Sequence, residues 1–250
     1  MAIVLRSARQ IAQIREAGRL VAETFETLRP HVRPGVTTRE LDRIAEQFIR
    51  SRGAVPAYKG YRGFPATICV APNSVICHGI PNNTALKEGD IIGIDIGARL
   101  KGWFGDACVT YPVGAISPEA QRLLDVAQES MWRGIRAAQS GKRLGDIGAA
   151  IQQYVESNKF SIVREYTGHG VGERLHEDPS VPHFGRAGTG ERLRPGFIFT
   201  IEPMVNAGRH ETALDPKDGW TVRTADGSLS AQFEHSLVIT DNGPELLTLL

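Results

Sequence analysis

LKEGDIIGIDIGARLKGWFGD, residues 86–106, is the stretch on which the fold depends. Its run from Ile91 to Ile96 is apolar enough for a buried strand, yet Asp95 lies inside it. A lone buried carboxylate is costly unless a positive group compensates it. On a strand, Gly93 and Gly97 share the face of Asp95, so they leave room for a bulky group beside the backbone.

The chain can reverse around residues 99–102, and we expect it to return as a second strand. Direct pairing would then place Asp106 opposite Asp95 on the same face of the sheet. Two like charges that face each other repel unless cations separate them. The hairpin therefore predicts a metal site.

Composition places the chain among ordinary globular proteins, with 250 residues, 41% hydrophobic and 23% charged. A net charge of +1 argues against binding to DNA or to a membrane surface. No apolar run reaches transmembrane length and the N-terminus lacks a signal-peptide pattern, which predicts a cytoplasmic protein. The three cysteines form no disulfide framework and are expected to be reduced.

Helical spacing predicts four amphipathic helices, two before each group of strands. Ser7 and Thr37 each open a capping-box sequence, Ser117 precedes Pro118, and Asp146 is the expected cap of the fourth helix. A stretch rich in proline and glycine, roughly residues 167–196, predicts a long loop.

The order of elements repeats, and residues match at a nearly constant offset. One set recurs 107 positions later: Leu86, Gly89, Ile91, Ile94 and Asp95 match Leu193, Gly196, Ile198, Ile201 and Glu202. We therefore expect one domain, residues 1–250, with pseudo-repeats of about 1–114 and 115–250 related by a pseudo-twofold axis. The predicted class is α/β (α+β), with a curved, antiparallel-rich sheet covered by helices on its outer face. The alternative is that any two helix–strand units look alike.

Four acids lie in apolar, strand-like runs: Asp95, Asp106, Glu202 and Glu234. His169 lies between glycines in TGHGVG, where the backbone can approach a ligand closely. One imidazole and four carboxylates suit a pair of divalent transition ions. Two such ions roughly 3.5–4 Å apart can hydrolyse an amide or a phosphoester. Taken singly, each acid could instead be a surface carboxylate or part of a salt bridge.

These residues belong to motifs that resemble the type I methionine aminopeptidases, in the short bacterial form without an N-terminal zinc-binding extension. The resemblance covers essentially the whole chain and rests on VICHGIP (75–81), IDIG (94–97), GD (105–106), GHGVG (168–172), IEPM (201–204) and FEH (233–235). It implies the pita-bread (creatinase/aminopeptidase) fold. The implied activity is metal-dependent removal of the N-terminal methionine from nascent proteins whose second residue is small.

The resemblance also implies the metal ligands: Asp95, Asp106, His169, Glu202 and Glu234. Asp106 and Glu234 would bridge two divalent ions (Fe²⁺, Mn²⁺ or Co²⁺), His169 and Glu202 would complete one shell, and Asp95 would chelate the other ion. A metal-bridged hydroxide would attack the scissile carbonyl, with Glu202 also acting as proton shuttle.

Two histidines, His78 and His176, match substrate-contacting residues, and His176 would stabilise the tetrahedral intermediate. Without the resemblance, each would be read as a solvated loop histidine. The methionine pocket would be lined by Tyr61, Phe64, Cys69 and Trp220. The chain departs from the family pattern at Tyr58, Arg62 and Leu175, and these changes are expected to alter the width of the pocket.

The implied partners are N-termini of nascent polypeptides, with contact to the ribosome, and we expect a monomer. Two other functions remain open at this point. An Xaa-Pro aminopeptidase or prolidase generally carries an additional N-terminal domain, which 250 residues do not accommodate. A metal-free pita-bread binding protein should lack some of the five ligands, whereas all five residue types are present here.

Overall fold

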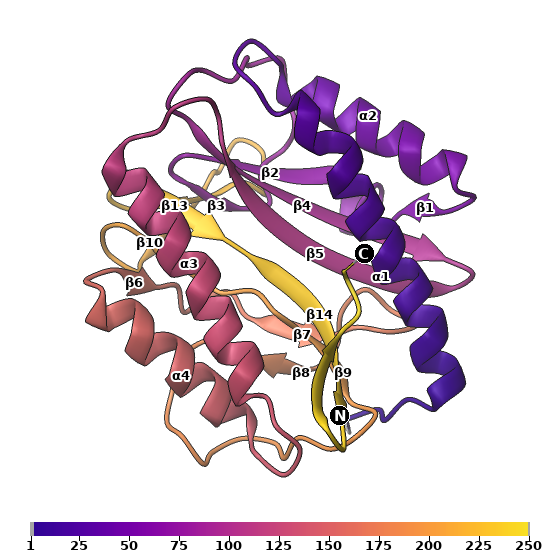
Figure 1. The fold of residues 1–250 in the computed structure, drawn as a ribbon. Coiled ribbons are helices and arrows are strands. Elements are labelled where there is room, and N and C mark those ends of the chain that lie inside the picture. Colours follow the sequence, from indigo (N-terminus) through magenta and orange to yellow (C-terminus); the bar gives the residue numbers. More distant parts are fainter. Residues whose placement is uncertain (1–2, 250) are drawn as a thin grey trace.

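The computed structural model describes residues 3–249, in which four α-helices pack on one side of a curved sheet (Figure 1). The α-helices are α1 (Ala8–Leu28), α2 (Thr38–Ser51), α3 (Pro118–Ala137) and α4 (Leu144–Ser157), and two short 3-10 helices span Arg29–His31 and Tyr61–Gly63. The strands are β1 (Val55–Pro56), β2 (Ile68–Pro72), β3 (Val75–Cys77), β4 (Ile91–Leu100), β5 (Trp103–Pro112), β6 (Ser161–Ile162), β7 (Gly168–Gly170), β8 (Glu177–Val181), β9 (Ile198–Ile201), β10 (Met204–Asn206), β11 (Thr212–Leu214), β12 (Val222–Thr224), β13 (Ser230–Gln232), β14 (Glu234–Thr240) and β15 (Gly243–Leu246).

The main sheet has nine strands, in the order β1–β4–β5–β14–β9–β7–β8, with β2 also paired to β4 and β15 to β14. Its pairings are antiparallel. Two further sheets of the described residues have the orders β13–β10–β6 and β11–β12–β3. In Figure 1, α1 and α2 cover one half of the main sheet, and α3 and α4 cover the other half. This confirms the predicted α/β class, with helices on the outer face of a curved antiparallel sheet.

The turn between β4 and β5 fixes how the two strands pair. Leu100 pairs with Trp103, so the turn consists of Lys101 and Gly102 alone. Both turn residues have positive φ, 51° and 92°. A two-residue turn with positive φ at both positions matches the right-handed twist of the strands, and glycine adopts that backbone without strain.

This turn places the two acids of the hairpin diagonally. Asp106 pairs with Gly97, and Asp95 pairs with Cys108. The expectation that Asp106 lies directly opposite Asp95 is therefore wrong, because the chain reverses one residue later than direct pairing requires. The two carboxylates still share one face, since residues two apart on a strand point the same way.

Successive side chains of β4 point alternately to the apolar core and to the candidate site. Ile92, Ile94 and Ile96 are fully buried and belong to the apolar cluster that contains residues of α1 and α2. Burying each of these side chains contributes about 1.5–3 kcal/mol. Because neighbours on a strand point to opposite faces, this packing directs Asp95 to the face away from the helices.

The helix starts agree with the sequence at three of the four positions. Ser7 and Thr37 form capping boxes, and the hydroxyl of Ser117 accepts a hydrogen bond at the start of α3. The expected cap at Asp146 is wrong: Arg143 is the N-cap of α4. Asp146 lies in the first turn, where its carboxylate accepts the Arg143 N–H at 2.8 Å.

The N-cap residues of α2 and α4 each form an isolated β-bridge. Thr37 forms an isolated bridge with Ala85, and Arg143 forms one with Arg192. Arg143 lies 106 positions after Thr37, and Arg192 lies 107 positions after Ala85. These contacts support the proposal of a duplicated unit; the division at about residue 114 stays a prediction.

Candidate metal centre and active site

Five neighbouring strands of the main sheet supply one candidate ligand each. Their order is β4–β5–β14–β9–β7. The ligands in the same order are Asp95, Asp106, Glu234, Glu202 directly after β9, and His169. All five line one cavity of about 270 Å³. Residues far apart in the sequence therefore meet because their strands are adjacent.

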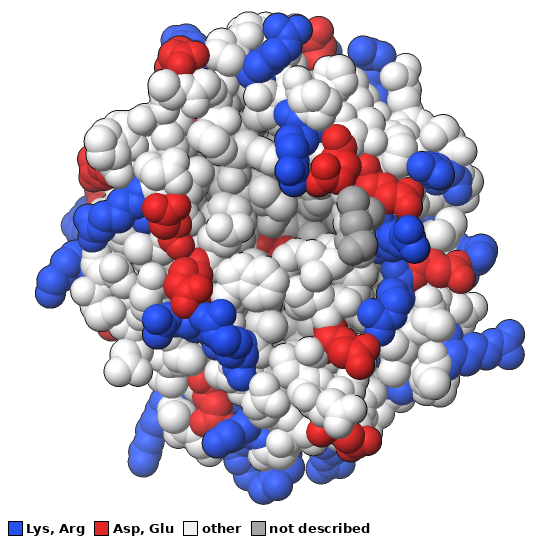
Figure 2. Space-filling view, viewed as in Figure 1, with Lys and Arg blue, Asp and Glu red and all other residues white. Residues whose placement is uncertain are grey.

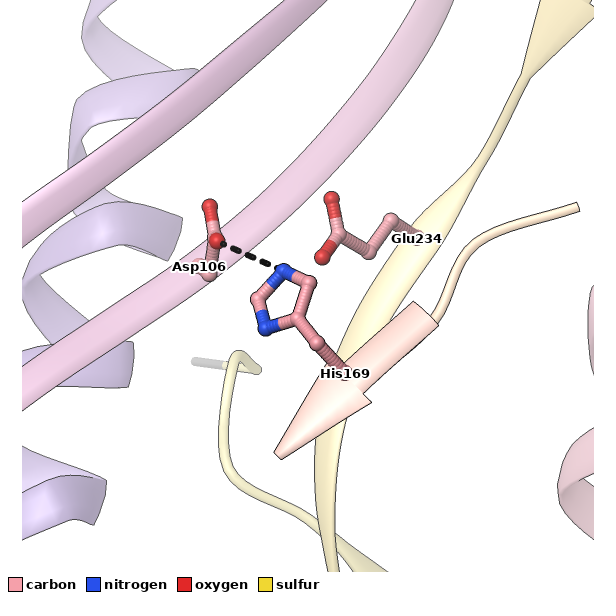
Figure 3. A group of neighbouring side chains, drawn as sticks. All are labelled: Asp106, His169 and Glu234. Atoms are coloured by element: carbon pink, nitrogen blue, oxygen red, sulfur yellow. Dashed lines mark ion pairs between the residues drawn. The ribbon is translucent and has the colours of Figure 1, made fainter. Parts of the chain in front are cut away.

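The imidazole of His169 lies among carboxylates (Figure 3). Its Nε2 is 3.6 Å from Oδ2 of Asp106 and 3.6 Å from Oε1 of Glu202. Ligand atoms of Asp106, His169 and Glu234 all lie within 4.8 Å of one another. The arrangement leaves a common point toward which one nitrogen and several oxygens are directed.

Hydrogen bonds orient His169 for ligation. Its Nδ1 lies 3.0 Å from the carbonyl oxygen of Gly170. A carbonyl can only accept, so Nδ1 carries the hydrogen and Nε2 presents a lone pair, as in many metal-binding histidines.

The prediction of a plain loop at 167–196 is wrong here, because β7 and β8 form within it and β7 pairs with β9.

The carboxylates lack protein cations. Among residues 3–249, no lysine or arginine forms an ion pair with Asp95, Asp106, Glu202 or Glu234. Oε1 of Glu234 is buried and has no hydrogen-bond partner in this part of the chain. Buried anions without compensation are costly, so the donor set fits divalent cations.

Burial changes the acidity of this cluster. It raises the pKa of Asp95 to about 7 and that of Glu202 to about 8. For Asp106 and Glu234, burial and then the neighbouring carboxylates raise the pKa well above its usual range. Without added positive charge, the four groups therefore resist simultaneous ionisation.

Residues outside the predicted set hold Glu202 in place. Thr200 donates a hydrogen bond to its Oε1 at 2.7 Å, and Gln232 donates to its Oε2 at 3.2 Å. The Glu202 backbone N–H donates to Nε2 of the buried His183 at 3.0 Å. Only the position of Thr200, two residues before Glu202 in the same extended run, could have indicated such a role from sequence.

The two histidines expected to contact substrate both line the cavity. His176 lies at its exposed rim, with Nδ1 2.9 Å from the Tyr61 hydroxyl and its ring centroid 4.1 Å from that of His169. His78 is half-buried on the cavity wall, and its ring meets Tyr166 edge to face with centroids 5.6 Å apart. Burial lowers the pKa of His78, which favours the neutral imidazole.

The segment that carries His176 is fixed by a buried ion pair. Glu177 follows His176 and accepts contacts from Arg6 Nη2 at 2.8 and 2.7 Å. The same carboxylate accepts the backbone N–H groups of Glu173 and Arg174 at 2.9 and 3.1 Å. Sequence reasoning missed this pair, because Arg6 and Glu177 are 171 positions apart.

An apolar wall adjoins the carboxylates. The predicted pocket residues are all in it, and the full apolar and aromatic wall is Tyr58, Tyr61, Phe64, Cys69, Tyr166, Leu175, Met204 and Trp220. Phe64 and Trp220 meet edge to face with ring centroids 5.2 Å apart. Sequence reasoning missed Tyr166 and Met204, although Met204 belongs to the IEPM motif. Burial raises the pKa of the Cys69 thiol, which fits a wall residue rather than a nucleophile.

Tyr58 reaches from this wall into the metal centre. Its hydroxyl forms hydrogen bonds to Oδ1 of Asp95 and Oδ1 of Asp106. The expectation that this departure alters the apolar pocket is therefore incomplete, because the residue also contacts two of the candidate ligands.

Figure 2 shows how the charged side chains are distributed over one face of the molecule. On the face shown in Figure 2, lysines and arginines are dispersed around the rim among acidic residues. Within the described residues 3–249, no helix combines the length and apolarity of a membrane span.

Comparison with known proteins agrees with this geometry. Residues 12–241 match the model of metallopeptidase family M24. The methionine aminopeptidase 1 of Bacillus subtilis is 52% identical over 98% of this chain and 99% of its own length. A crystal structure of the methionine aminopeptidase from Rickettsia prowazekii superposes with a TM-score of 0.98, at 47% identity over 99% of this chain and 100% of that chain.

A more distant likeness concerns the fold alone. An Xaa-Pro dipeptidase from Bacillus anthracis has a TM-score of 0.78 and 24% identity, and this chain covers 61% of that protein. The full-length matches at higher identity are to methionine aminopeptidases. The chain therefore belongs to metallopeptidase family M24 and, within it, to the methionine aminopeptidases.

Proposed function

We propose that this chain removes the N-terminal methionine from peptides and nascent proteins whose second residue is small. The observation that carries the proposal is a cluster of buried acids and one histidine, without lysine or arginine partners in the described chain, beside an apolar pocket. The full-length similarity to methionine aminopeptidases supports the same reaction.

The centre would hold two divalent cations, with Fe²⁺, Mn²⁺ and Co²⁺ all suited to its oxygen-rich ligands. The ligands would be Asp95, Asp106, His169, Glu202 and Glu234. When bound, such cations supply Lewis acidity and activate water at neutral pH.

Protein groups around the centre would move the protons and stabilise charge. Glu202, fixed through both carboxylate oxygens, would take a proton from the attacking water and deliver it to the leaving amine. His176 has one ring nitrogen engaged by Tyr61, which leaves the other to donate to the oxygen of the scissile carbonyl. His78 would contact the substrate beside its second residue.

Selectivity for methionine would come from the apolar wall. An unbranched thioether needs a narrow apolar slot and no hydrogen-bonding partner. Phe64, Cys69, Leu175 and Trp220 supply such a surface next to the carboxylates. A cytoplasmic location, a monomeric state and contact with the ribosome stay predictions.

Peptide hydrolysis with defined metals tests this function. Metal-free protein should cleave Met-Ala-Ser after addition of Mn²⁺, Co²⁺ or Fe²⁺, and should leave Ala-Pro peptides intact. Cleavage of the proline peptide alone would favour a prolidase-like enzyme. Cation binding without hydrolysis of either peptide would contradict the peptidase function, and absence of cation binding would favour a metal-free binding protein.

A further inference from the structure

Tyr58 occupies a slot that the backbone provides for it. Its ring lies against Gly97 of β4, where an added Cβ would be 2.7 Å from Tyr58 Cε1. Only 7% of Tyr58 is exposed, and its ring packs in one cluster with Phe64, Cys69 and Leu175. A side chain at position 97 could not coexist with this ring, so the phenol is held close to the carboxylates.

The hydroxyl meets two acids with only one hydrogen to donate. Oδ1 of Asp95 and Oδ1 of Asp106 are both its partners. A phenolic O–H can donate a single hydrogen bond, so it cannot satisfy two ionised carboxylates at once. The position between two carboxylate oxygens is also the position that a cation shared by them would take.

On the opposite side of the centre, within residues 3–249, no protein group is hydrogen-bonded to the side chains of two candidate ligands at once. Asp106, His169 and Glu234 converge within 4.8 Å, and Oε1 of Glu234 has no hydrogen-bond partner within residues 3–249. The centre is therefore asymmetric: a protein hydroxyl is shared by two carboxylates on the Asp95 side, and no protein group of the described chain is shared in this way on the His169 side.

We propose that the Tyr58 hydroxyl competes with the second cation for the carboxylates of the Asp95 side and so lowers the affinity of this side for it. This inference rests on the metal centre of the proposed function. The first cation binds next to His169 without displacing a protein group. The second must break the hydrogen bonds of the Tyr58 hydroxyl with Asp95 and Asp106, which requires the ring to rotate toward the pocket.

Calorimetric titration of Mn²⁺ into metal-free protein tests the competition. The matched variants are Tyr58→Phe, which keeps the ring and removes the hydroxyl, and Tyr154→Phe, which makes the same change on α4. We expect the second cation to bind about tenfold or more tightly in Tyr58→Phe, because a hydrogen bond to a charged group no longer has to be broken. The first affinity should be unchanged, and Tyr154→Phe should behave as the unmodified protein.

A double variant locates the effect. In the Asp95→Asn background, the weak site should be lost, and Tyr58→Phe should no longer change the second binding phase. Unchanged or weaker second-cation binding in Tyr58→Phe would overturn the proposal, the weaker result identifying the hydroxyl as a ligand. If neither the unmodified protein nor any variant binds Mn²⁺, the metal centre itself is contradicted. Melting curves show whether each variant is folded.

Discussion

The two sides of the metal centre are stabilised in different ways. On the β9 side, Glu202 accepts hydrogen bonds from Thr200 and Gln232, and Thr200 joins this carboxylate only to the backbone of His169. On the β4–β5 side, the two hairpin carboxylates share the hydroxyl of Tyr58. A shared set of candidate ligands therefore does not imply two equal cation sites, because the neighbours of each ligand decide what a cation must displace.

The largest effect is expected from removing Asp106 or Glu234, because each of these candidate ligands would serve both cation sites. Asp106→Ala and Glu234→Ala should each abolish turnover and weaken metal binding by more than the roughly 10–100-fold typical for loss of a supporting residue. Metal content and hydrolysis of Met-Ala-Ser check this. Asp125→Ala on α3 is the control and should behave as the unmodified protein. Retained activity of Asp106→Ala or Glu234→Ala at low metal would show that these two acids do not bridge.

Removing the rim histidine should affect chemistry and spare both cation sites. His176→Ala should lower kcat by ~10²–10³, the scale of losing one oxyanion donor. The metal content should not change, because His176 bonds Tyr61 rather than a carboxylate. Steady-state kinetics and metal analysis of the same sample check this, and loss of metal would make His176 a ligand.

Cation binding should also stabilise the fold, mainly through the β9 side. At a free Mn²⁺ concentration a hundredfold above the tight dissociation constant, the free energy of unfolding should rise by about 2.7 kcal/mol. For a chain of this size the melting temperature should rise by roughly 5–10 °C. Scanning calorimetry with and without a chelator measures it, and an equal melting temperature in both conditions would contradict the compensation of the buried acids.

The smallest effect is expected from removing the hydrogen bonds that hold Glu202, because this changes the β9 side of the centre alone. Thr200→Val and Gln232→Leu should each weaken the tight cation by roughly 10–100-fold, as expected when a ligand loses a supporting hydrogen bond. Thr212→Val on β11 is the matched control. In calorimetric titration, an effect only on the affinity of the more weakly bound cation would contradict the assignment of Glu202 to the tightly bound one.

Local patterns predicted most of the fold and the candidate ligands. Alternation around Asp95 identified a buried strand with an acid on its other face, and capping boxes at Ser7 and Thr37 marked helix starts. The pairing register was not predictable from alternation alone. It depends on which two residues form the turn, and the backbone of Lys101 and Gly102 moved Asp106 by two positions.

Contacts between distant segments could not be predicted from one sequence. The pair Arg6–Glu177 and the bond from the Glu202 backbone to His183 join segments that only the sheet order brings together. The sequence marks Tyr58 as a departure from the family pattern at the pocket, but its contact with Asp95 depends on the space above Gly97. Local chemistry therefore indicated the candidate ligands, and packing determined their neighbours.

Anomalous diffraction from crystals grown with Mn²⁺ would show whether five neighbouring strands bring four acids and one histidine together around a pair of cations. We expect two anomalous peaks, both contacted by Asp106 and Glu234. The peak beside His169 and Glu202 should be the stronger, and the peak beside Asp95 should have lower occupancy. Absence of any ordered Mn²⁺ among these five residues, with protons or protein cations in its place, would contradict the account.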